Sequence, residues 1–490
     1  MDLRRRRLSL ILIIVACLAL CAACQSDGHW GLAYRATPDR SALEQVPIEG
    51  LVPGTHFLVG ESLVVYSAAE PAGADQRDSL EWDRGRHLAK SDADGNFLIR
   101  PTWGHADAAA EVSAFYHLNR YLAYFRTLGF GDFGEALNIA VNYRPEGEGD
   151  FLAGSTLVRG RPGMVVGQWG ERNLAFDPDV LGHELFHVVH SQIVPGSTAE
   201  VENAIDALGF NTIPMAVAEA VADYFSCSLS GDPDVGEYTA AALGLPFLST
   251  LANDARFPRD RTGQSHRDGQ ALSGALWEVR AVVGADALDQ ALYDALVEMP
   301  RLVQEGRRSG ERCPTFGFVA NRILAHLQRA IVGDSVDQAR RLFAARGLMS
   351  DCDVVPLAIG ERRRLWLPGI ADSFGNVESR QGGLPAPLQM RIDVPDECTA
   401  LSISLSMEAD DDEPREAVAF RIDLRAEKPV RYTLDGENLE TDSDWFESTT
   451  SSAIEIGAER IDALRGRALF VSIRTTAEDD VGLSVSASVR

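Results

Sequence analysis

The sequence predicts an α+β protein in which a central region containing most of the helices is flanked by β-rich segments. Three observations predict this class. Apolar and polar residues alternate between residues 48 and 101, apolar residues recur at helical spacing through much of residues 103–349, and alternation returns beyond residue 350. With 490 residues the chain is too long for one ordinary core, so several domains of about 100–200 residues are expected.

The first 23 residues have the pattern of an export signal. Four arginines at residues 4–7 precede an apolar run at residues 8–23, which is shorter than the ~20 residues that span a bilayer as a helix. The stretch LCAAC resembles a bacterial lipobox, which implies that Cys24 is lipidated after cleavage. Gln25 favours the outer membrane or the cell surface by resemblance to Gram-negative lipoproteins. Plain secretion after cleavage at Ala23 is the alternative.

The net charge and the cysteine content limit which partners and which redox state of the cysteines are expected. Removal of residues 1–23 takes away four Arg and one Asp, so the formal net charge moves from −26 to −29. Nucleic acid is therefore not an expected partner, because such binding neutralises phosphates with Lys and Arg. A membrane is expected only through the N-terminal lipid anchor. Four further cysteines fit two disulfides in an exported chain, with three pairings open. They are Cys227, Cys313, Cys352 and Cys398.

The region after the signal is expected to hold a tether and a small domain. Residues 24–47 lack hydrophobic periodicity, so we expect no regular structure there. Residues 48–102 are expected to form a small β-sandwich, in which the turn DADG at residues 92–95 precedes a strand through Phe97. This turn resembles that of modules similar to the carboxypeptidase regulatory domain. An unrelated β-hairpin is the alternative.

Residues 103–349 are expected to form the central domain, and residues 350–490 an antiparallel β-sandwich. The central domain begins with a helix that ends near Gly129, continues through a β-rich stretch and is mostly helical from Asp177. The face of the first helix is expected to consist of Val112, Phe115, Leu118, Leu122 and Phe125. In the C-terminal domain the acidic loop EADDDEPRE could hold Ca²⁺, but we favour a solvated loop because no ligand spacing is fixed.

The stretch HELFH places His183, Glu184 and His187 in the pattern H-E-x-x-H. Positions i and i+4 of a helix share one face, so both imidazoles can hold one metal ion. Glu184 is rotated by ~100°, which places its carboxylate beside the metal, where it suits a general base. Asp177 is expected to cap this helix and Pro178 to begin it. The pattern alone is only moderately specific for a metal site, because it also occurs by chance in helices. A third ligand is needed to distinguish the two cases.

A second stretch, IPMAVAEAVADYF, supplies that ligand. Glu219 and Asp223 lie one turn apart on a helix expected between Pro214 and Gly231, among apolar neighbours. Buried carboxylates need a metal or a partner, so one of the two is expected to complete the site. The other, one turn along the helix, is expected to accept a hydrogen bond from a ligating histidine. A solvated acidic face is the alternative. His190 is too far along its helix to share the metal and is expected to pack at the helix end.

The combination of H-E-x-x-H with E-x-x-x-D resembles the thermolysin-like and fungalysin-like gluzincins over roughly residues 105–349. The resemblance implies a two-lobed zincin peptidase unit, with a β-rich upper lobe and a helical lower lobe. It implies that His183, His187 and Glu219 bind Zn²⁺, and that Asp223 accepts the hydrogen bond from a ligating histidine. It also implies an exported zinc metalloendopeptidase. Glu184 would then act as the general base on a zinc-bound water, and proteins or peptides would be the substrates.

Two further elements follow from this resemblance. The stretch SHRDGQALSGALWEVR is similar to the element whose histidine stabilises the oxyanion, which implies that role for His266. Asp260 is the nearest candidate for the aspartate that supports this histidine. The stretch GMVVGQWG, residues 163–170, is the expected edge strand to which a substrate peptide pairs.

A different class of function stays open. A surface lipoprotein with a binding or adhesive role could keep an inactive or structural zincin scaffold, and Glu184→Gln would then change nothing. A structural zinc site needs a closed fourth position. Cys227, the nearest candidate, lies eight residues and about two turns beyond Glu219.

Overall fold

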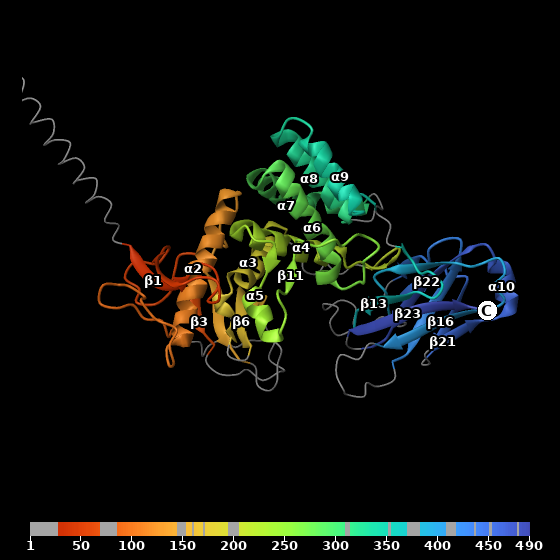
Figure 1. Cartoon of the computed structure of the whole chain (residues 1–490), viewed down its shortest axis with the longest axis horizontal. Helices are drawn as coiled ribbons and strands as arrows, with labels where there is room; N and C mark the ends of the chain where they lie inside the picture. The colour runs from red at the N-terminus through yellow and green to blue at the C-terminus, as the bar shows by residue number, and fades with distance from the viewer. Residues whose placement is uncertain are drawn as a thin grey trace, which may run out of the picture. The chain divides into compact units, whose positions relative to one another are not determined.

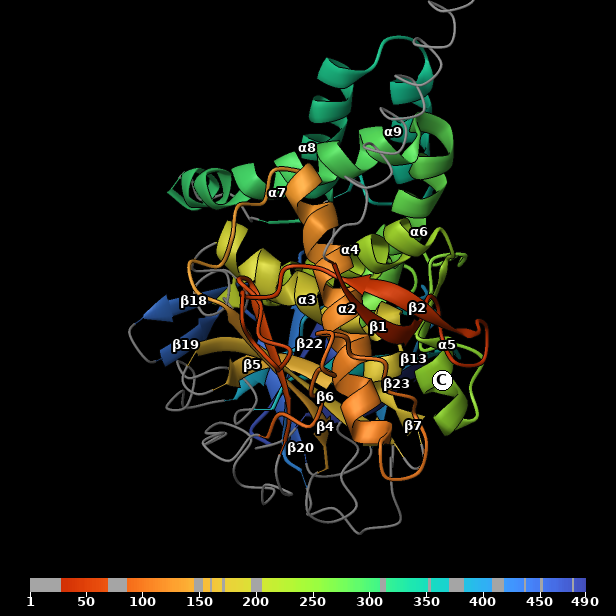
Figure 2. The same cartoon turned by 90° about the vertical axis from the view of Figure 1, so that its left-hand side faces the viewer.

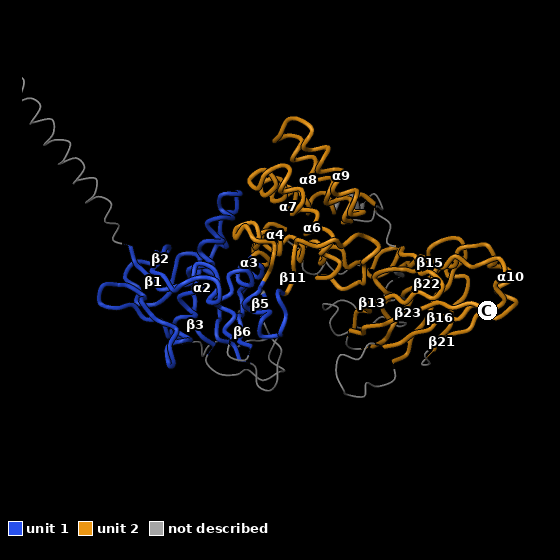
Figure 3. Tube along the Cα trace, viewed as in Figure 1, with its two compact units in different colours: residues 1–185, 236–247 blue, residues 186–235, 248–490 orange. Residues whose placement is uncertain are grey.

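The computed structural model shows an α+β chain with helices and several separate sheets (Figure 1). It divides into two compact units, Met1–Leu185 with Gly236–Phe247 and Phe186–Val235 with Leu248–Arg490 (Figure 3). The division passes through one continuous helix, α3 (Pro178–Ile193). The structure describes residues 28–68, 86–144, 153–158, 161–169, 172–194, 205–308, 314–350, 354–369, 383–407, 418–435, 438–449, 453–477 and 480–490.

The N-terminal segment forms a hairpin where the sequence predicts a tether. Strand β1 (His29–Tyr34) pairs antiparallel with β2 (Leu43–Ile48). A Cβ atom at Gly31 would lie 2.7 Å from Ile48 and 2.8 Å from Val112, so the hairpin packs closely on helix α2 (Ala106–Thr127). The hairpin is therefore part of the folded body. The two strands are short and are stabilised by packing on a helix distant in sequence, so their local pattern does not predict the hairpin.

Residues 48–102 also differ from the expected independent β-sandwich. Strand β3 (Leu63–Ser67) pairs in parallel with β4 (Leu137–Tyr143), so it belongs to a sheet completed by the following domain. The predicted turn is present, because Asp92 accepts hydrogen bonds from the backbone N–H groups of Asp94 and Asn96, both at 2.9 Å. Phe97 then donates its N–H to the carbonyl of Trp30 at 2.6 Å, which joins this segment to β1.

The sheet of the first unit has the order β3-β4-β6-β5, with β7 (Arg172–Asn173) on β6. Strand β6 (Arg161–Trp169) is hydrogen-bonded to β4 on one side and to β5 (Ala153–Val158) on the other. The expected edge strand at residues 163–170 is therefore wrong, because β6 is interior and β5 lies at the edge. The order of strands is a non-local property, and the apolar run of β6 fits an interior strand.

Helix α2 (Ala106–Thr127) packs against β1, β3 and β4 and lies across the sheet in the view of Figure 2. The five residues of its predicted face are all fully buried. The predicted end is also confirmed, because Gly129 has a φ of 109° and its N–H bonds to the carbonyl of Arg126 at 3.1 Å.

The remaining helices follow in chain order, and within the second unit α6 packs against α4, α7 and α9. No helix in the described part of the chain is both long and apolar enough to cross a membrane. The helices and the short elements between them are η3 (Leu174–Phe176), α3 (Pro178–Ile193), β8 (Ile205–Asp206), β9 (Gly209–Phe210), α4 (Ile213–Ser230), β10 (Asp234–Val235), α5 (Glu237–Ala240), η5 (Ala241–Leu243), β11 (Ser249–Thr250), α6 (Ser265–Val283), α7 (Ala285–Arg308), α8 (Phe316–Ala330) and α9 (Ser335–Ala345).

The C-terminal module, residues 354–490, contains two main sheets that share one hydrophobic core. Alternate residues of facing strands, such as Ile403 and Val471, are fully buried in that core. The first sheet consists of β12 (Val354–Pro356), β15 (Gln389–Asp393), β22 (Ala468–Thr475), β17 (Phe420–Ala426) and β20 (Trp445–Thr449), with β14 (Leu384–Pro385) on β22. The second consists of β13 (Arg362–Leu367), β23 (Val481–Val489), β16 (Leu401–Met407) and β21 (Ala453–Ile456). The hairpin of β18 (Tyr432–Asp435) with β19 (Asn438–Thr441) and helix α10 (Ala458–Leu464) complete the module.

The cysteines do not form the two expected disulfides. Among the described residues, Cys227 and Cys398 are buried thiols whose sulfur atoms contact the carbonyls of Asp234 at 3.8 Å and Ala400 at 3.3 Å. An even count alone therefore misled. Cys313, Cys352, the lipidation candidate Cys24 and the acidic loop at residues 408–416 lie outside the described residues.

Candidate metal centre

Helix α3 begins where the sequence predicts. Oδ1 of Asp177 accepts a hydrogen bond from the N–H of Asp179 at 3.2 Å, and Pro178 is the first helical residue. Oδ2 accepts from the backbone N–H and the hydroxyl of Thr239 at 2.9 and 2.7 Å. Burial raises the pKa of the Asp177 carboxyl, against the opposing effect of these hydrogen bonds. The start of α3 is thus fixed by a fully buried cap.

A glycine lets a second helix approach α3 next to the first histidine. A Cβ atom at Gly182 would lie 2.3 Å from Cζ of Tyr121, a separation that no side chain tolerates. Tyr121 on α2 therefore packs directly on the α3 backbone at the residue preceding His183. The sequence contains no local signal for this contact, because the two residues are far apart in the chain.

The H-E-x-x-H residues share one partly exposed stripe of α3. His183, Glu184 and His187 are half-buried, whereas Leu185 and Phe186 between them are fully buried. This pattern is that of an amphipathic helix whose apolar side enters the core. The burial of that side holds the two imidazoles on the opposite side.

Helix α4 brings the acidic residues predicted to complete the site. Pro214 lies in its first turn, and Gly231 ends it in the left-handed region with a φ of 76°. The side chain of Glu219 is 14% exposed, while Ala218 and Ala220 on either side of it are buried. The carboxylate is thus held in an apolar helix with only a narrow access to solvent.

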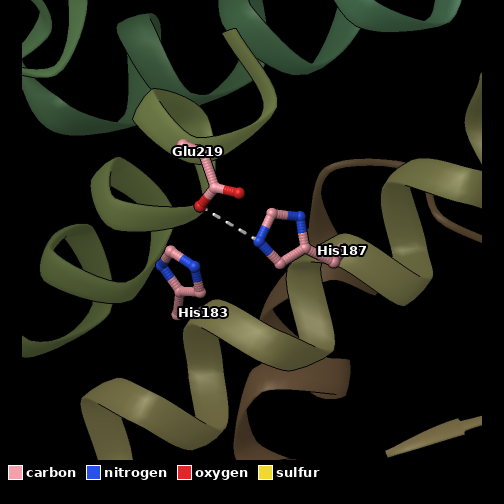
Figure 4. A group of neighbouring side chains, drawn as sticks. All are labelled: His183, His187 and Glu219. Carbon is pink, nitrogen blue, oxygen red and sulfur yellow. Dashed lines mark ion pairs between the residues drawn. The ribbon is translucent and has the colours of Figure 1, made fainter. Parts of the chain in front are cut away.

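The structure brings His183, His187 and Glu219 together (Figure 4). One ligand atom from each residue lies within 4.8 Å of the other two. Nε2 of His187 is 3.4 Å from Oε2 of Glu219. The three side chains point toward one another from α3 and α4, which is the arrangement expected for ligands of a single metal ion.

His266 lies beside the same carboxylate. Its Nε2 is 3.3 Å from Oε2 of Glu219, and its side chain is 64% exposed. Its Nδ1 is 3.0 Å from Nε2 of Gln264. If the Gln264 amide donates there, Nδ1 is the acceptor and the ring proton is on Nε2, which faces Glu219. His266 can then act as a hydrogen-bond donor at this centre.

A close helix contact explains why His266 reaches Glu219. A Cβ atom at Gly269 would lie 2.7 Å from the carbonyl oxygen of Ala216 and 3.2 Å from the nitrogen of Ala220. Gly269 therefore allows the backbones of α6 and α4 to touch. This contact places the first turn of α6, which carries His266, next to Glu219.

The support expected from Asp260 is provided by another residue. The carboxylate of Asp260 accepts hydrogen bonds from the N–H of Arg256 at 2.8 Å and from the guanidinium of Arg259. The residue that contacts His266 is Gln264, whose Oε1 also caps α6 by accepting from the N–H of Arg267 at 2.7 Å. A glutamine in the cap position two residues before the histidine was the signal that the sequence analysis missed.

A buried ion pair fixes the loop that leads to His266. Nε of Arg261 donates to Asp268 at 3.1 Å, and both side chains are almost fully buried. Asp268 also accepts from the N–H of Thr262 at 2.7 Å and of Gly263 at 3.0 Å. Nη2 of Arg261 lies 3.3 Å from Oγ1 of Thr212 at the start of α4. This pair, which the sequence did not predict, connects the first turns of α4 and α6.

Two other predicted residues lie near the centre. Asp223 is buried one turn beyond Glu219, and its Oδ2 accepts a hydrogen bond from the hydroxyl of Ser249 at 2.9 Å. His190 is buried with its ring 5.8 Å from that of Phe186, as expected for a histidine packed at the helix end. Burial, together with nearby His187, lowers the pKa of His190 to about 4, so the ring is neutral at pH 7.

The donor set fits zinc. Two imidazoles and one carboxylate are the protein ligands of catalytic His₂Glu zinc sites. Within the described part of the chain no fourth His, Cys or carboxylate donor joins the three within the same 4.8 Å. A centre with three protein ligands keeps a position for a reacting molecule, whereas structural zinc sites are closed by four.

Comparisons with known proteins add little to this geometry. No family model matches the chain, and no curated protein does. Among solved structures, the precursor of protealysin, a metalloproteinase from Serratia proteamaculans, is similar with a TM-score of 0.41 and 14% identity. The similarity covers 60% of this chain and 91% of that chain. A similarity at this level does not indicate a function for this chain.

Proposed function

We propose that this protein is a zinc-dependent endopeptidase of the gluzincin type. The observation that carries the proposal is the convergence of His183, His187 and Glu219 on one point, with His266 beside them. His183, His187 and Glu219 would hold the zinc ion. When bound, zinc supplies the Lewis acidity that polarises the carbonyl of the scissile peptide bond.

The side chains of the chain divide the remaining chemistry. Glu184 follows His183 on the half-buried stripe of α3, where its carboxylate can take a proton from the attacking water. The water oxygen bonds to the carbonyl carbon, and Glu184 passes the proton to the amine as the C–N bond breaks. His266 donates a hydrogen bond from Nε2 to the oxyanion that forms in between.

The proposal includes the setting of the enzyme. The peptidase unit would have the two-lobed zincin architecture, and proteins or peptides would be its substrates. The export signal and Cys24 would anchor it as a lipoprotein of the outer membrane or the cell surface. These parts of the proposal depend on the sequence motifs given above.

The decisive experiment compares wild type with Glu184→Gln in soluble protein from residue 25 onward. We expect both to bind about one zinc per chain, because Glu184 is not a ligand. Casein hydrolysis should fall by on the order of 10³-fold or more in the variant, since loss of a general base has costs of this size. Glu305→Gln, the same substitution on an exposed part of α7, is the matched control and should leave the rate unchanged.

Two results would contradict the proposal. Wild-type protein that binds zinc but cleaves neither casein nor broad peptide libraries would favour a scaffold with a binding or adhesive role. Wild-type protein that binds no zinc would remove the assignment of Glu219 first.

A further inference from the structure

The segment that leads into α4 is held by the C-terminal module. Strands β8 and β9 pair as a hairpin over residues 205–210, and Asn211 and Thr212 connect it directly to α4. Asn211 accepts a hydrogen bond from the N–H of Ile213 at 3.1 Å, so the connection is short and ordered. Whatever fixes this hairpin therefore fixes the start of the helix that presents Glu219.

Gln389, the first residue of β15, contacts the hairpin through its side-chain amide. Its Nε2 donates to the carbonyl oxygen of Leu208 at 2.9 Å and to that of Val430 at 2.6 Å. Its Oε1 accepts from the N–H of Val430 at 2.9 Å. The residue is 1% exposed, so these three hydrogen bonds are made without competition from solvent. One buried amide thus joins the hairpin to β15 and to the segment that precedes β18.

Further contacts surround this amide. The N–H of Tyr432 donates to the carbonyl of Ala207 at 3.0 Å. Ile205 packs on a small apolar cluster of the module formed by Val430, Tyr432 and Leu439. A Cβ atom at Gly209 would lie 2.4 Å from the carbonyl oxygen of Ala386, so the hairpin backbone touches the module directly.

The module also contacts the loop that leads into α6. The N–H of Trp366 on β13 donates to the carbonyl of Thr262 at 2.8 Å. Gly263 leaves space for Pro387, whose Cγ would lie 3.0 Å from a Cβ atom at that position. Thr262 and Gly263 directly precede Gln264, the residue that contacts His266. The module therefore contacts both segments that lead to the neighbouring side chains Glu219 and His266.

We propose that Gln389 is a positioning residue of the zinc site, acting through the β8–β9 hairpin on helix α4. The inference rests on the proposed function only in that Glu219 is a zinc ligand. A carboxylate whose helix is fixed from its first residue loses less freedom when it binds a metal. The C-terminal module then helps to position the helix that carries Glu219, and its removal would weaken zinc binding.

The test measures zinc affinity by competition with a chelating dye, which does not depend on peptidase activity. Gln389→Met keeps the length of the side chain and removes its three hydrogen bonds, so we expect zinc to bind about tenfold more weakly, as for loss of an outer-shell partner. Ile205→Ala weakens the same contact from the side of the hairpin and should have a similar effect. Both substitutions act through one contact. The double variant should therefore bind zinc with the same affinity as whichever single variant binds it more weakly.

The control is Arg465→Ala, which removes a side-chain hydrogen bond to the carbonyl of Cys398 within the module. It should bind zinc like wild type. A folded Gln389→Met variant with wild-type affinity, or an equal loss in Arg465→Ala, would overturn the inference while leaving the proposed function intact. If Gln389→Met does not fold, Ile205→Ala decides by the same criterion. Wild-type protein without zinc would overturn the proposed function and the inference together.

Discussion

Two regions of the molecule hold charged side chains away from water, and they do so in different ways. In the C-terminal module the guanidinium of Arg474 donates to Asp423 at 2.6 Å, with exposures of 2% and 0%. Arg421 donates to the other carboxylate oxygen at 3.0 Å, and the hydroxyl of Tyr432 lies 3.3 Å from Asp423. Burial and the charge of Asp423 raise the pKa of Tyr432, so the phenol stays protonated. The buried charges of Arg474 and Asp423 are thus matched by each other within the protein, while the second arginine, Arg421, is 30% exposed.

The metal centre combines a carboxylate with histidines instead of with arginines. There Glu219 faces His187 and His266 at 3.4 and 3.3 Å, and the group keeps partial access to solvent. A neutral imidazole offers a lone pair, and a carboxylate offers negative charge, so the set is complementary to a cation. In the C-terminal module, the counter-charge of a buried charge contributes to the free energy of unfolding. In the metal centre, the converging donor atoms contribute to the affinity for a metal ion. Variants in the two regions should therefore separate the two properties.

The largest expected effect is on stability and comes from Asp423→Asn. This change leaves the Arg474 charge buried without its full partner, which typically costs about 3–5 kcal/mol of unfolding free energy. Denaturant titration would measure the loss. Zinc content of the folded variant should stay at the wild-type value, and a loss of zinc at unchanged stability would break the comparison.

Next in size is Glu219→Gln, which tests the opposite region. Removal of a ligand should weaken zinc binding by more than about 100-fold, the upper end of the cost of losing an outer-shell partner. Dye competition would measure it. Metal-free stability should not fall, because the substitution removes a partly buried charge and keeps the shape. If the variant does not fold, Glu219 is needed for stability, as Asp423 is, and the contrast between the two regions is wrong.

The smallest expected effect belongs to His266→Phe and sharpens the roles inside the metal centre. We expect kcat to fall by on the order of 10²-fold, the cost of one oxyanion donor, with KM little changed and zinc still bound. Steady-state kinetics on a peptide substrate would show this split. A loss of zinc instead would make His266 a ligand and the site a closed one.

The sequence predicted the parts of the site that are encoded locally. Helical spacing, the Asp177 cap and the Gly231 stop place His187 and Glu219 on their helices without any knowledge of the rest of the fold. The contacts that join those helices were not predictable in this way. These contacts join residues that are distant in the chain, Gly182 with Tyr121 and Gly269 with Ala216. A glycine in the sequence does not indicate which residue will pack against it.

The N-terminal region shows the same limit for strands. Strand β3 finds its partner β4 more than 70 residues later, so the alternation of residues 63–67 indicated a strand but not its sheet. The residue that contacts His266 was missed for a different reason. The family resemblance called for an aspartate, but Asp260 is held by Arg259, and Gln264 at the cap of α6 lies 3.0 Å from His266.

The most direct test of the central claim is a crystal structure of the wild-type protein with diffraction data collected on both sides of the zinc absorption edge. The account predicts one anomalous peak bound by His183, His187 and Glu219, with no fourth protein ligand. No peak at this position, or a peak with His266 as a fourth ligand, would contradict a catalytic zinc centre.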